Sequence, residues 1–140
     1  MIVNVADDLP GPYVPVSLYS GIALNLLTNA LKAITGSAEG TEHTVAFAAW
    51  NEINRHVLEV SDTGVGIPAV LWDRVFEPLY STTDAGPGPL GTGMGLGLAL
   101  VRRAAEAFGG KAAVVEPTYG FRTTVRVELP NGPRKEKGAQ

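Results

Sequence analysis

The longest regular pattern in the chain predicts an amphipathic helix from Ser17 to Ile34. Residues of one character recur there at helical spacing, which gathers them on one side of a helix. The predicted apolar side consists of Ser20, Ala23, Leu24, Leu27, Leu31 and Ile34, with only the serine weakly polar. The opposite side carries a polar stripe of Asn25, Asn29 and Lys32, spaced i, i+4 and i+7. We therefore expect the leucine side to pack on the core.

Shorter patterns on both sides of this helix predict strands and two further helices. Strands are expected over Met1–Ala6, Thr44–Trp50, His56–Ser61, Lys111–Glu116 and Phe121–Leu129. Helices are expected over Ala69–Phe76 and from about Met94 to Phe108, the second ending at Gly109 and Gly110. This order lacks regular strand–helix–strand alternation. It predicts an α+β fold, in which a two-layer sandwich has a mixed, mostly antiparallel sheet covered on one face by three helices.

The chain length of 140 residues indicates one domain with a sizeable core. We expect this domain to span residues 1–130 and to be followed by a polar, disordered tail over residues 131–140. Within the domain, Glu77–Leu90 includes Pro78, Pro87 and Pro89 and cannot form regular structure. A loop this long in a compact domain is typical of a lid or a binding loop.

Composition narrows the class of protein. Hydrophobic residues make up 45% of the chain and charged residues 18%, which is typical of a soluble globular protein. The net charge of −3 argues against a nucleic-acid partner. No apolar run is long enough to span a membrane, the N-terminus lacks a signal-peptide pattern, and there is no cysteine. We expect a cytoplasmic, monomeric domain without direct membrane contact, which leaves open that it is part of a membrane-anchored sensor.

Two glycine clusters are the strongest chemical signal. The first is DTGVGIP (Asp62–Pro68), directly after a predicted strand, and the second is GTGMGLGL (Gly91–Leu98), which leads into a predicted helix. Free backbone amides at the start of a helix form a natural phosphate site. The polar stripe of the long helix adds to this signal, because asparagine is a poor helix-interior residue and a solvated face normally carries more charge. A bound nucleotide is therefore expected.

Three other motifs do not support a function. Gly86–Gly91 matches G-x-G-x-x-G, but no strand precedes it and its prolines lack the amides that a pyrophosphate needs. No G-x-x-x-x-G-K-[ST] sequence is present, which excludes a P-loop. His43 and His56 lack metal-ligand spacing, so a structural or surface role is favoured over a zinc site.

Four segments in order resemble the nucleotide-binding boxes of one family. They are NLLTNALKAI (Asn25–Ile34), DTGVGIP (Asp62–Pro68), VFEPLYST (Val75–Thr82) and GTGMGLGLALV (Gly91–Val101). Together they resemble the ATP-binding catalytic domain of sensor histidine kinases, in the superfamily of DNA gyrase B subunits, heat-shock chaperone ATPases and mismatch-repair ATPases. The resemblance runs from about Pro15 to Pro130 and implies the Bergerat-type ATP-binding fold, with ATP and Mg²⁺ as cofactors.

The resemblance also implies which residues contact the nucleotide. Asp62 would accept a hydrogen bond from the adenine amino group and repel the carbonyl of guanine. Asn29 would hold Mg²⁺, for which an amide oxygen is a suitable ligand. Thr123 or Thr124 would support Asp62 from the neighbouring strand, and the sequence does not distinguish them. The full set is Asn25, Asn29, Lys32, Asp62, Gly64, Gly66, Ile67, Phe76, Tyr80, Thr83, Gly91, Thr92, Gly93, Met94, Gly95, Leu96, Gly97, Leu98 and Thr123.

The family's phosphoaccepting histidine has no counterpart here. That histidine lies on a separate helical hairpin and has an acidic neighbour directly after it, whereas Thr44 follows His43 and Val57 follows His56. The resemblance therefore implies a domain that phosphorylates a partner hairpin, with a response regulator downstream. Asn25 replaces the glutamate base of the chaperone and gyrase relatives, so efficient ATP hydrolysis is not expected.

Two other functions remain open at this point. One is a protein kinase of the anti-sigma serine type or the mitochondrial type. The other is a non-catalytic, nucleotide-gated interaction module. Phosphotransfer to histidine would indicate the histidine kinase, and phosphotransfer to serine would indicate the other protein kinases. The module would phosphorylate neither.

Overall fold

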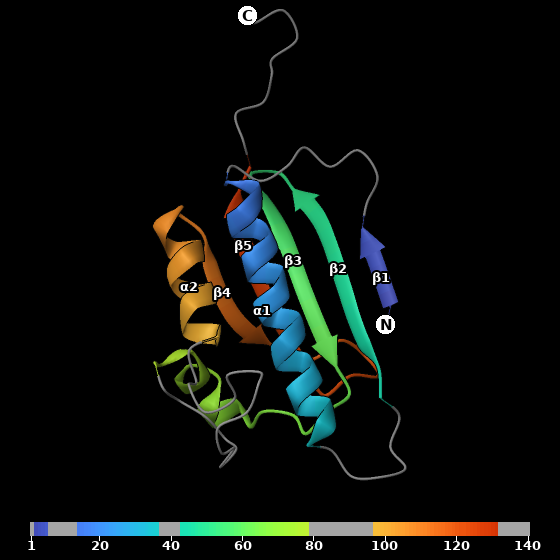
Figure 1. Ribbon diagram of the computed structural model, residues 1–140. Helices are drawn as coiled ribbons and strands as arrows, with labels where there is room; N and C mark the ends of the chain where they lie inside the picture. The colour runs from blue at the N-terminus through green and yellow to red at the C-terminus, as the bar shows by residue number, and fades with distance from the viewer. Residues whose placement is uncertain (1, 6–13, 37–42, 79–96, 132–140) are drawn as a thin grey trace, which may run out of the picture.

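The computed structural model describes residues 2–5, 14–36, 43–78 and 97–131. Within these ranges, five strands form one sheet in the order β1-β2-β3-β5-β4 (Figure 1). They are β1 (Ile2–Val5), β2 (Val45–Glu52), β3 (Arg55–Asp62), β4 (Lys111–Val115) and β5 (Thr123–Pro130). Strand β1 is parallel to β2, and the other three pairings are antiparallel. The predicted mixed, mostly antiparallel sheet is confirmed.

In the part of the chain that the structure describes, two α-helices lie side by side on one face of this sheet (Figure 1). They are α1 (Val16–Thr35) and α2 (Gly97–Ala107). The short helix expected over Ala69–Phe76 is present as two 3₁₀ turns, η1 (Ala69–Leu71) and η2 (Arg74–Phe76). The two-layer α+β fold is thus confirmed. None of the helices in the described ranges is long and apolar enough to cross a membrane.

The core fills the space between the helices and the sheet. Strand residues alternate between the two faces of a sheet, so every second residue of β3 and β5 points at the helices. On β3 these are Leu58 and Val60, and on β5 they are Val125 and Val127, all at most 4% exposed. From the helices, the core includes Ile22, Leu26, Ala30, Ile34, Leu98, Val101 and Ala105.

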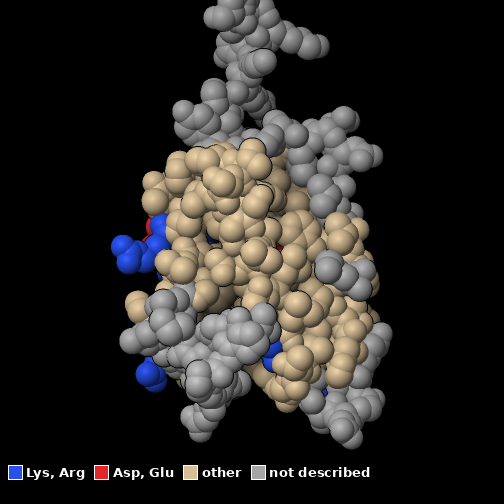
Figure 2. All heavy atoms as spheres, viewed as in Figure 1, with Lys and Arg blue, Asp and Glu red and all other residues tan. Residues whose placement is uncertain are grey.

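The apolar side predicted for the long helix is only partly correct. Ile34 is buried and Ala23 and Leu27 pack against the core, but Ser20, Leu24 and Leu31 are exposed. The buried residues of α1 are Ile22, Leu26, Ala30 and Ile34, whereas Leu24 and Leu31 are 66% and 52% exposed. Both sides of the helix contain apolar residues, so hydrophobicity alone did not identify the side that packs on the sheet. The face of the molecule seen in Figure 2 carries few charged side chains among the described residues.

A tight turn at the end of α2 fixes how this helix meets the sheet. The amide of Gly110 donates to the carbonyl of Ala105 at 2.8 Å, and that of Gly109 donates to Glu106 at 3.0 Å. Gly109 has φ +84°, which favours glycine. A Cβ on Gly110 would lie 2.0 Å from the carbonyl oxygen of Glu128, so β5 packs directly on the turn. The predicted helix end at Gly109-Gly110 is confirmed.

The other face of the sheet carries charged pairs. Arg126 donates to Glu59 at 2.6 Å across β3 and β5, and Arg55 pairs with the largely buried Glu128. Opposite charges on directly paired residues stabilise neighbouring strands. Among the described residues, no helix packs on this face. The ion pairs are consistent with a sheet that needs only one helical layer.

Candidate functional site

Asp62, the last residue of β3, is a buried carboxylate. Its side chain is at the end of the sheet where α1 finishes, and the residue is 3% exposed. One carboxylate oxygen accepts a hydrogen bond from the amide of Gly64 at 2.8 Å. The backbone carbonyl of Asp62 accepts from the amide of Arg122 at 2.8 Å. These two bonds fix both the side chain and the backbone of Asp62.

Burial raises the pKa of Asp62 to about 6, and the Gly64 hydrogen bond opposes part of this rise. No ion pair within the described part of the chain involves this carboxylate. An ionised carboxylate that is buried without a cation gains strongly from a hydrogen-bond donor. The site therefore suits a ligand that presents an N–H group to Asp62.

Thr123 provides a second polar group at the same place. It pairs directly with Asp62 across β3 and β5, so both side chains lie on the helix side of the sheet. The Thr123 hydroxyl is buried and has no hydrogen-bond partner. Thr124 lies on the opposite face, where its hydroxyl bonds the Ser61 hydroxyl at 2.8 Å. Of the two threonines, only Thr123 lies beside Asp62 on this side of the sheet.

The glycines of the first cluster allow α1 to pack closely on the segment that follows Asp62. A Cβ on Gly64 would lie 2.5 Å from the backbone carbon of Ala33, so α1 occupies the place of a side chain. Gly66 has φ +80°, a conformation that favours glycine. Ile67 packs against the core, and its carbonyl accepts from the Trp72 indole at 2.9 Å. The segment after Asp62 is therefore held by α1 on one side and by η1 on the other.

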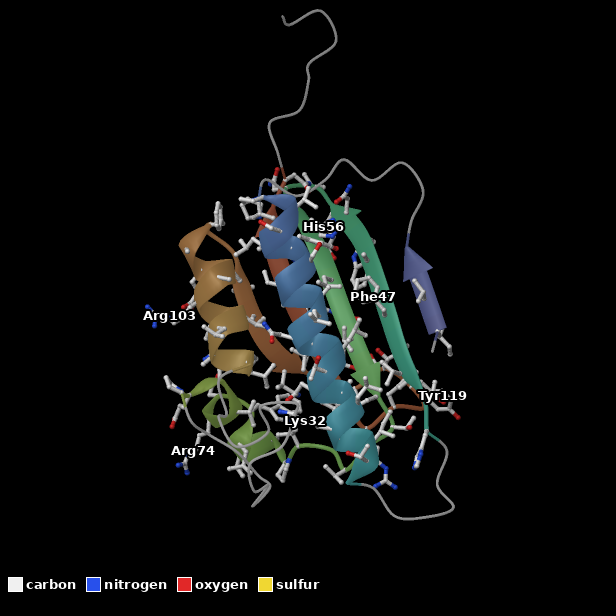
Figure 3. The ribbon with its side chains drawn as sticks, viewed as in Figure 1. Lys32, Phe47, His56, Arg74, Arg103 and Tyr119 are labelled. Carbon is white, nitrogen blue, oxygen red and sulfur yellow. The ribbon has the colours of Figure 1, made fainter. Side chains whose placement is uncertain are left out.

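The polar stripe of α1 lies on a flank of the helix, next to the buried side. Asn25, Asn29 and Lys32 are all half-buried. A Cβ on Gly97 would lie 3.8 Å from the amide oxygen of Asn25, so the stripe faces the first turn of α2. Figure 3 shows Lys32 in the lower half of α1, toward the end of β3. The structure thus brings Asn25 close to Gly97, the first described residue of α2.

Three further predicted site residues have defined places. Phe76 and Leu98 are buried in the core cluster, and Gly97 begins the described part of α2. The other predicted positions lie outside the described residues. They are Tyr80, Thr83, Gly91, Thr92, Gly93, Met94, Gly95 and Leu96. Residues 79–90 of the loop expected over Glu77–Leu90 and residues 132–140 of the expected tail also lie outside the described residues.

A network of threonines and serine behind Asp62 was missed by the sequence reasoning. Thr124 bonds Ser61, and its hydroxyl also accepts from the amide of Thr118 at 3.1 Å. Thr63 accepts from the amide of Thr44 at 2.8 Å. These bonds tie the end of β3 to β5 and β2. Only the strand register, which pairs Ser61 with Thr124, reveals the network.

His56 has a structural role, as expected. It is 1% exposed, and its ring contacts the Tyr19 hydroxyl at 2.7 Å and the Asn51 amide oxygen at 3.0 Å. Burial lowers the pKa of His56, which favours the neutral ring. In the parts of the chain that the structure describes, no group of three or more histidine, cysteine or acidic residues could hold a metal.

Comparison with known proteins identifies the family. Residues 17–133 match the family described as histidine kinase-, DNA gyrase B-, and HSP90-like ATPase. This match covers most of the chain, so the protein belongs to that family. The resemblance of its four boxes to histidine kinase ATP-binding domains is confirmed.

Several curated relatives are sensor kinases. The circadian input-output histidine kinase CikA of Synechococcus elongatus is 35% identical over 109 residues, 78% of this chain and 14% of CikA. Histidine protein kinase DivJ of Caulobacter vibrioides is 39% identical over 78% of this chain and 17% of its own. The aerobic respiration control sensor protein ArcB of Escherichia coli is 33% identical over 91% and 16%. The chain spans less than a fifth of each relative.

Solved structures share the fold. Full-length ShkA in complex with AMPPNP matches with a TM-score of 0.75 and 27% identity, over 95% of this chain and 26% of ShkA. The mycobacterial sensor histidine kinase MprB matches with a TM-score of 0.69 and 27% identity, over 95% of this chain and 82% of the MprB chain. The catalytic domain of histidine kinase ThkA, at 21% identity and a TM-score of 0.73, matches in fold.

We predict that Asp62→Asn stabilises the nucleotide-free domain at pH 7. The pKa of Asp62 is about 6 in the folded state, above its ordinary value, so the folded state binds the proton more tightly than the unfolded state. The protonated carboxyl of Asp62 therefore stabilises the folded state below pH 4, and this contribution is lost as the pH rises to about 6. The loss amounts to about 3 kcal/mol, and asparagine avoids it while still accepting from Gly64.

Denaturant unfolding of both proteins at pH 4 and pH 7 measures this difference. The variant should be about 1–3 kcal/mol more stable than wild type at pH 7, with the advantage shrinking toward pH 4. His56 titrates in both proteins, so its contribution cancels. An advantage of equal size at the two pH values would contradict the raised pKa of Asp62.

Proposed function

We propose that this chain is the Mg-ATP-binding catalytic domain of a two-component sensor histidine kinase. It donates the γ-phosphoryl group to a histidine on a separate helical-hairpin domain, and a response regulator acts downstream. The observation that carries the proposal is the buried Asp62 carboxylate beside the unpartnered hydroxyl of Thr123, in a chain of the ATPase family. The proposal places the domain in the cytoplasm.

The adenine end of the ligand would contact Asp62 and Thr123. The exocyclic amino group of adenine donates hydrogen bonds, and the carboxylate only accepts them. The Thr123 hydroxyl both donates and accepts, so it can bond a ring nitrogen directly or through water. Guanine presents a carbonyl where adenine has its amino group, and two acceptors repel each other. This donor–acceptor pattern supports ATP over GTP.

The phosphate end would lie between α1 and the start of α2. The half-buried Asn25 approaches Gly97, and Asn29 is one turn further along the same side of α1. The first amides of an α-helix lack partners inside the helix and favour an anion. An amide oxygen is a hard ligand that suits Mg²⁺, which bridges phosphates and keeps several waters. Bound Mg²⁺ would neutralise charge that develops on the phosphoryl group.

Phosphoryl transfer in this proposal depends on positioning. Asn25 is an amide and cannot remove a proton from water, so it favours transfer to a partner over hydrolysis. ShkA was solved in complex with AMPPNP, which supports nucleotide binding by this fold. CikA and DivJ are named histidine kinases, which favours histidine over serine as the acceptor.

Asp62→Asn should abolish most ATP binding without unfolding the domain. The new amide places an N–H donor opposite the adenine amino group, so one hydrogen bond becomes a donor–donor contact. The expected loss is roughly 2–4 kcal/mol. Wild-type affinity should also fall below about pH 6, where Asp62 becomes protonated, while the variant lacks this dependence.

Calorimetric titration of ATP into both proteins tests the prediction. Glu106→Gln is a matched control, because it makes the same acid-to-amide change at an exposed position of α2. The control should bind like wild type. Affinity of Asp62→Asn within threefold of wild type would refute the assignment of Asp62 to adenine.

Asn29→Asp should weaken the binding of Mg-ATP far more than the binding of metal-free ATP. The substitution replaces a neutral metal ligand by a charged one and places negative charge beside the phosphates. Titrations with Mg²⁺ and with a chelator measure the two affinities separately. Asn54→Asp adds the same charge in the hairpin turn between β2 and β3 and should change neither. Equal losses with and without Mg²⁺ would count against Asn29 as the metal ligand.

A further inference from the structure

Arg102 connects three elements around the second helix. It projects from α2, and its guanidinium carbon lies 4.0 Å from the centre of the Phe76 ring in η2. The same group donates a hydrogen bond to the carbonyl of Ala112 in β4 at 3.2 Å. Its Nη2 atom also lies 3.6 Å from the exposed carboxylate of Asp73. One side chain therefore links α2, η2 and the edge of the sheet.

These contacts distinguish Arg102 from an ordinary surface arginine. Its side chain is 28% exposed, and the ring beneath it is 4% exposed and part of the core. A partly desolvated cation–π contact is stronger than one at the surface. The next residue, Arg103, is exposed and points away from the domain (Figure 3). The two adjacent arginines thus form a natural pair of test and control.

The contacts of Arg102 matter because this residue lies near the described start of α2. Gly97, at the start of the described helix, faces Asn25, and Arg102 follows it by five residues, which is about 7.5 Å along a helix. Phe76 precedes residues 79–96, which join η2 to α2 in the sequence. Arg102 therefore fixes the first turns of α2 relative to the end of η2 and to β4.

We propose that Arg102 is a positioning residue for the phosphate end of the nucleotide site. By stacking on Phe76 and bonding the Ala112 carbonyl, it sets where α2 begins relative to Asn25 on α1. This inference rests on the proposed function, because the ligand is ATP. The adenine end at Asp62 is held by other contacts, from Gly64 and Arg122, and does not depend on Arg102.

Lysine cannot replace arginine in this role. The planar guanidinium stacks on the ring with its face while its edge donates to a carbonyl. An ammonium group is a point charge and cannot make both contacts in the same geometry. Arg102→Lys should therefore resemble Arg102→Met, although it keeps the charge.

Three variants test the proposal in two ways. Arg102→Met keeps an unbranched apolar stem, Arg102→Lys keeps the charge, and Arg103→Met is the control on the same helix. Binding is measured by calorimetry with Mg-ATP and with AMP, which lacks the terminal phosphates. Hydrogen exchange is measured at the amides of Phe76 and Glu77, which bond Asp73 and Arg74 within η2. Thermal unfolding checks that each variant is folded.

Both Arg102 variants should bind Mg-ATP about five- to tenfold more weakly, with AMP affinity within twofold of wild type. Exchange at Phe76 and Glu77 should be faster in both, and Arg103→Met should match wild type throughout. Full rescue by lysine, equal losses for AMP and ATP, or an Arg102→Met protein that matches Arg103→Met would overturn the proposal.

If wild type binds no ATP, the proposed function fails. Exchange alone then decides whether Arg102 holds η2, and unchanged rates would overturn that too.

Discussion

The burial of one carboxylate at the end of β3 is the constraint on which the site depends. Asp62 forms no ion pair among the described residues, and burial raises its pKa to about 6 although the Gly64 hydrogen bond opposes the rise. Such a group destabilises the fold near neutral pH, so the surrounding structure must hold it in place. The amides of Gly64 and Arg122 do so, and the Ser61–Thr124 bond supports the strands from the other face. The carboxylate is thereby kept ready for a donor.

The rest of the fold arranges the other parts of the site around Asp62. Helix α1 packs so closely on the segment after β3 that only glycine fits at position 64. The same helix places Asn25 beside Gly97 of α2. The turn at Gly109-Gly110 and the contacts of Arg102 hold α2 against the sheet. In the proposed function, the one long helix α1 would contact both ends of the nucleotide. The open face of the sheet, lined by ion pairs, takes no part in it.

Much of the fold could be predicted from the sequence because local patterns determine it. Neighbouring residues alone predicted the alternation along the strands, the glycine pair after α2 and the position of Asp62 at the end of a strand. The buried side of α1 could not be predicted, since Leu24 and Leu31 are as apolar as Leu26 and only tertiary packing separates them. The same limit applies to Thr123 and Thr124, because the register of β3 and β5 decides which of them lies beside Asp62. Packing partners that are distant in the sequence, such as Gly64 with Ala33, leave no local pattern.

We propose that the buried carboxylate of Asp62 recognises the amino group of adenine. Calorimetric titration with ATP and with inosine triphosphate tests it most directly, because the two ligands differ chiefly by an amino group and a carbonyl at the same ring position. The account predicts that inosine triphosphate binds at least about thirtyfold more weakly, from an unpaired acceptor facing Asp62. Equal affinity for the two nucleotides would contradict it.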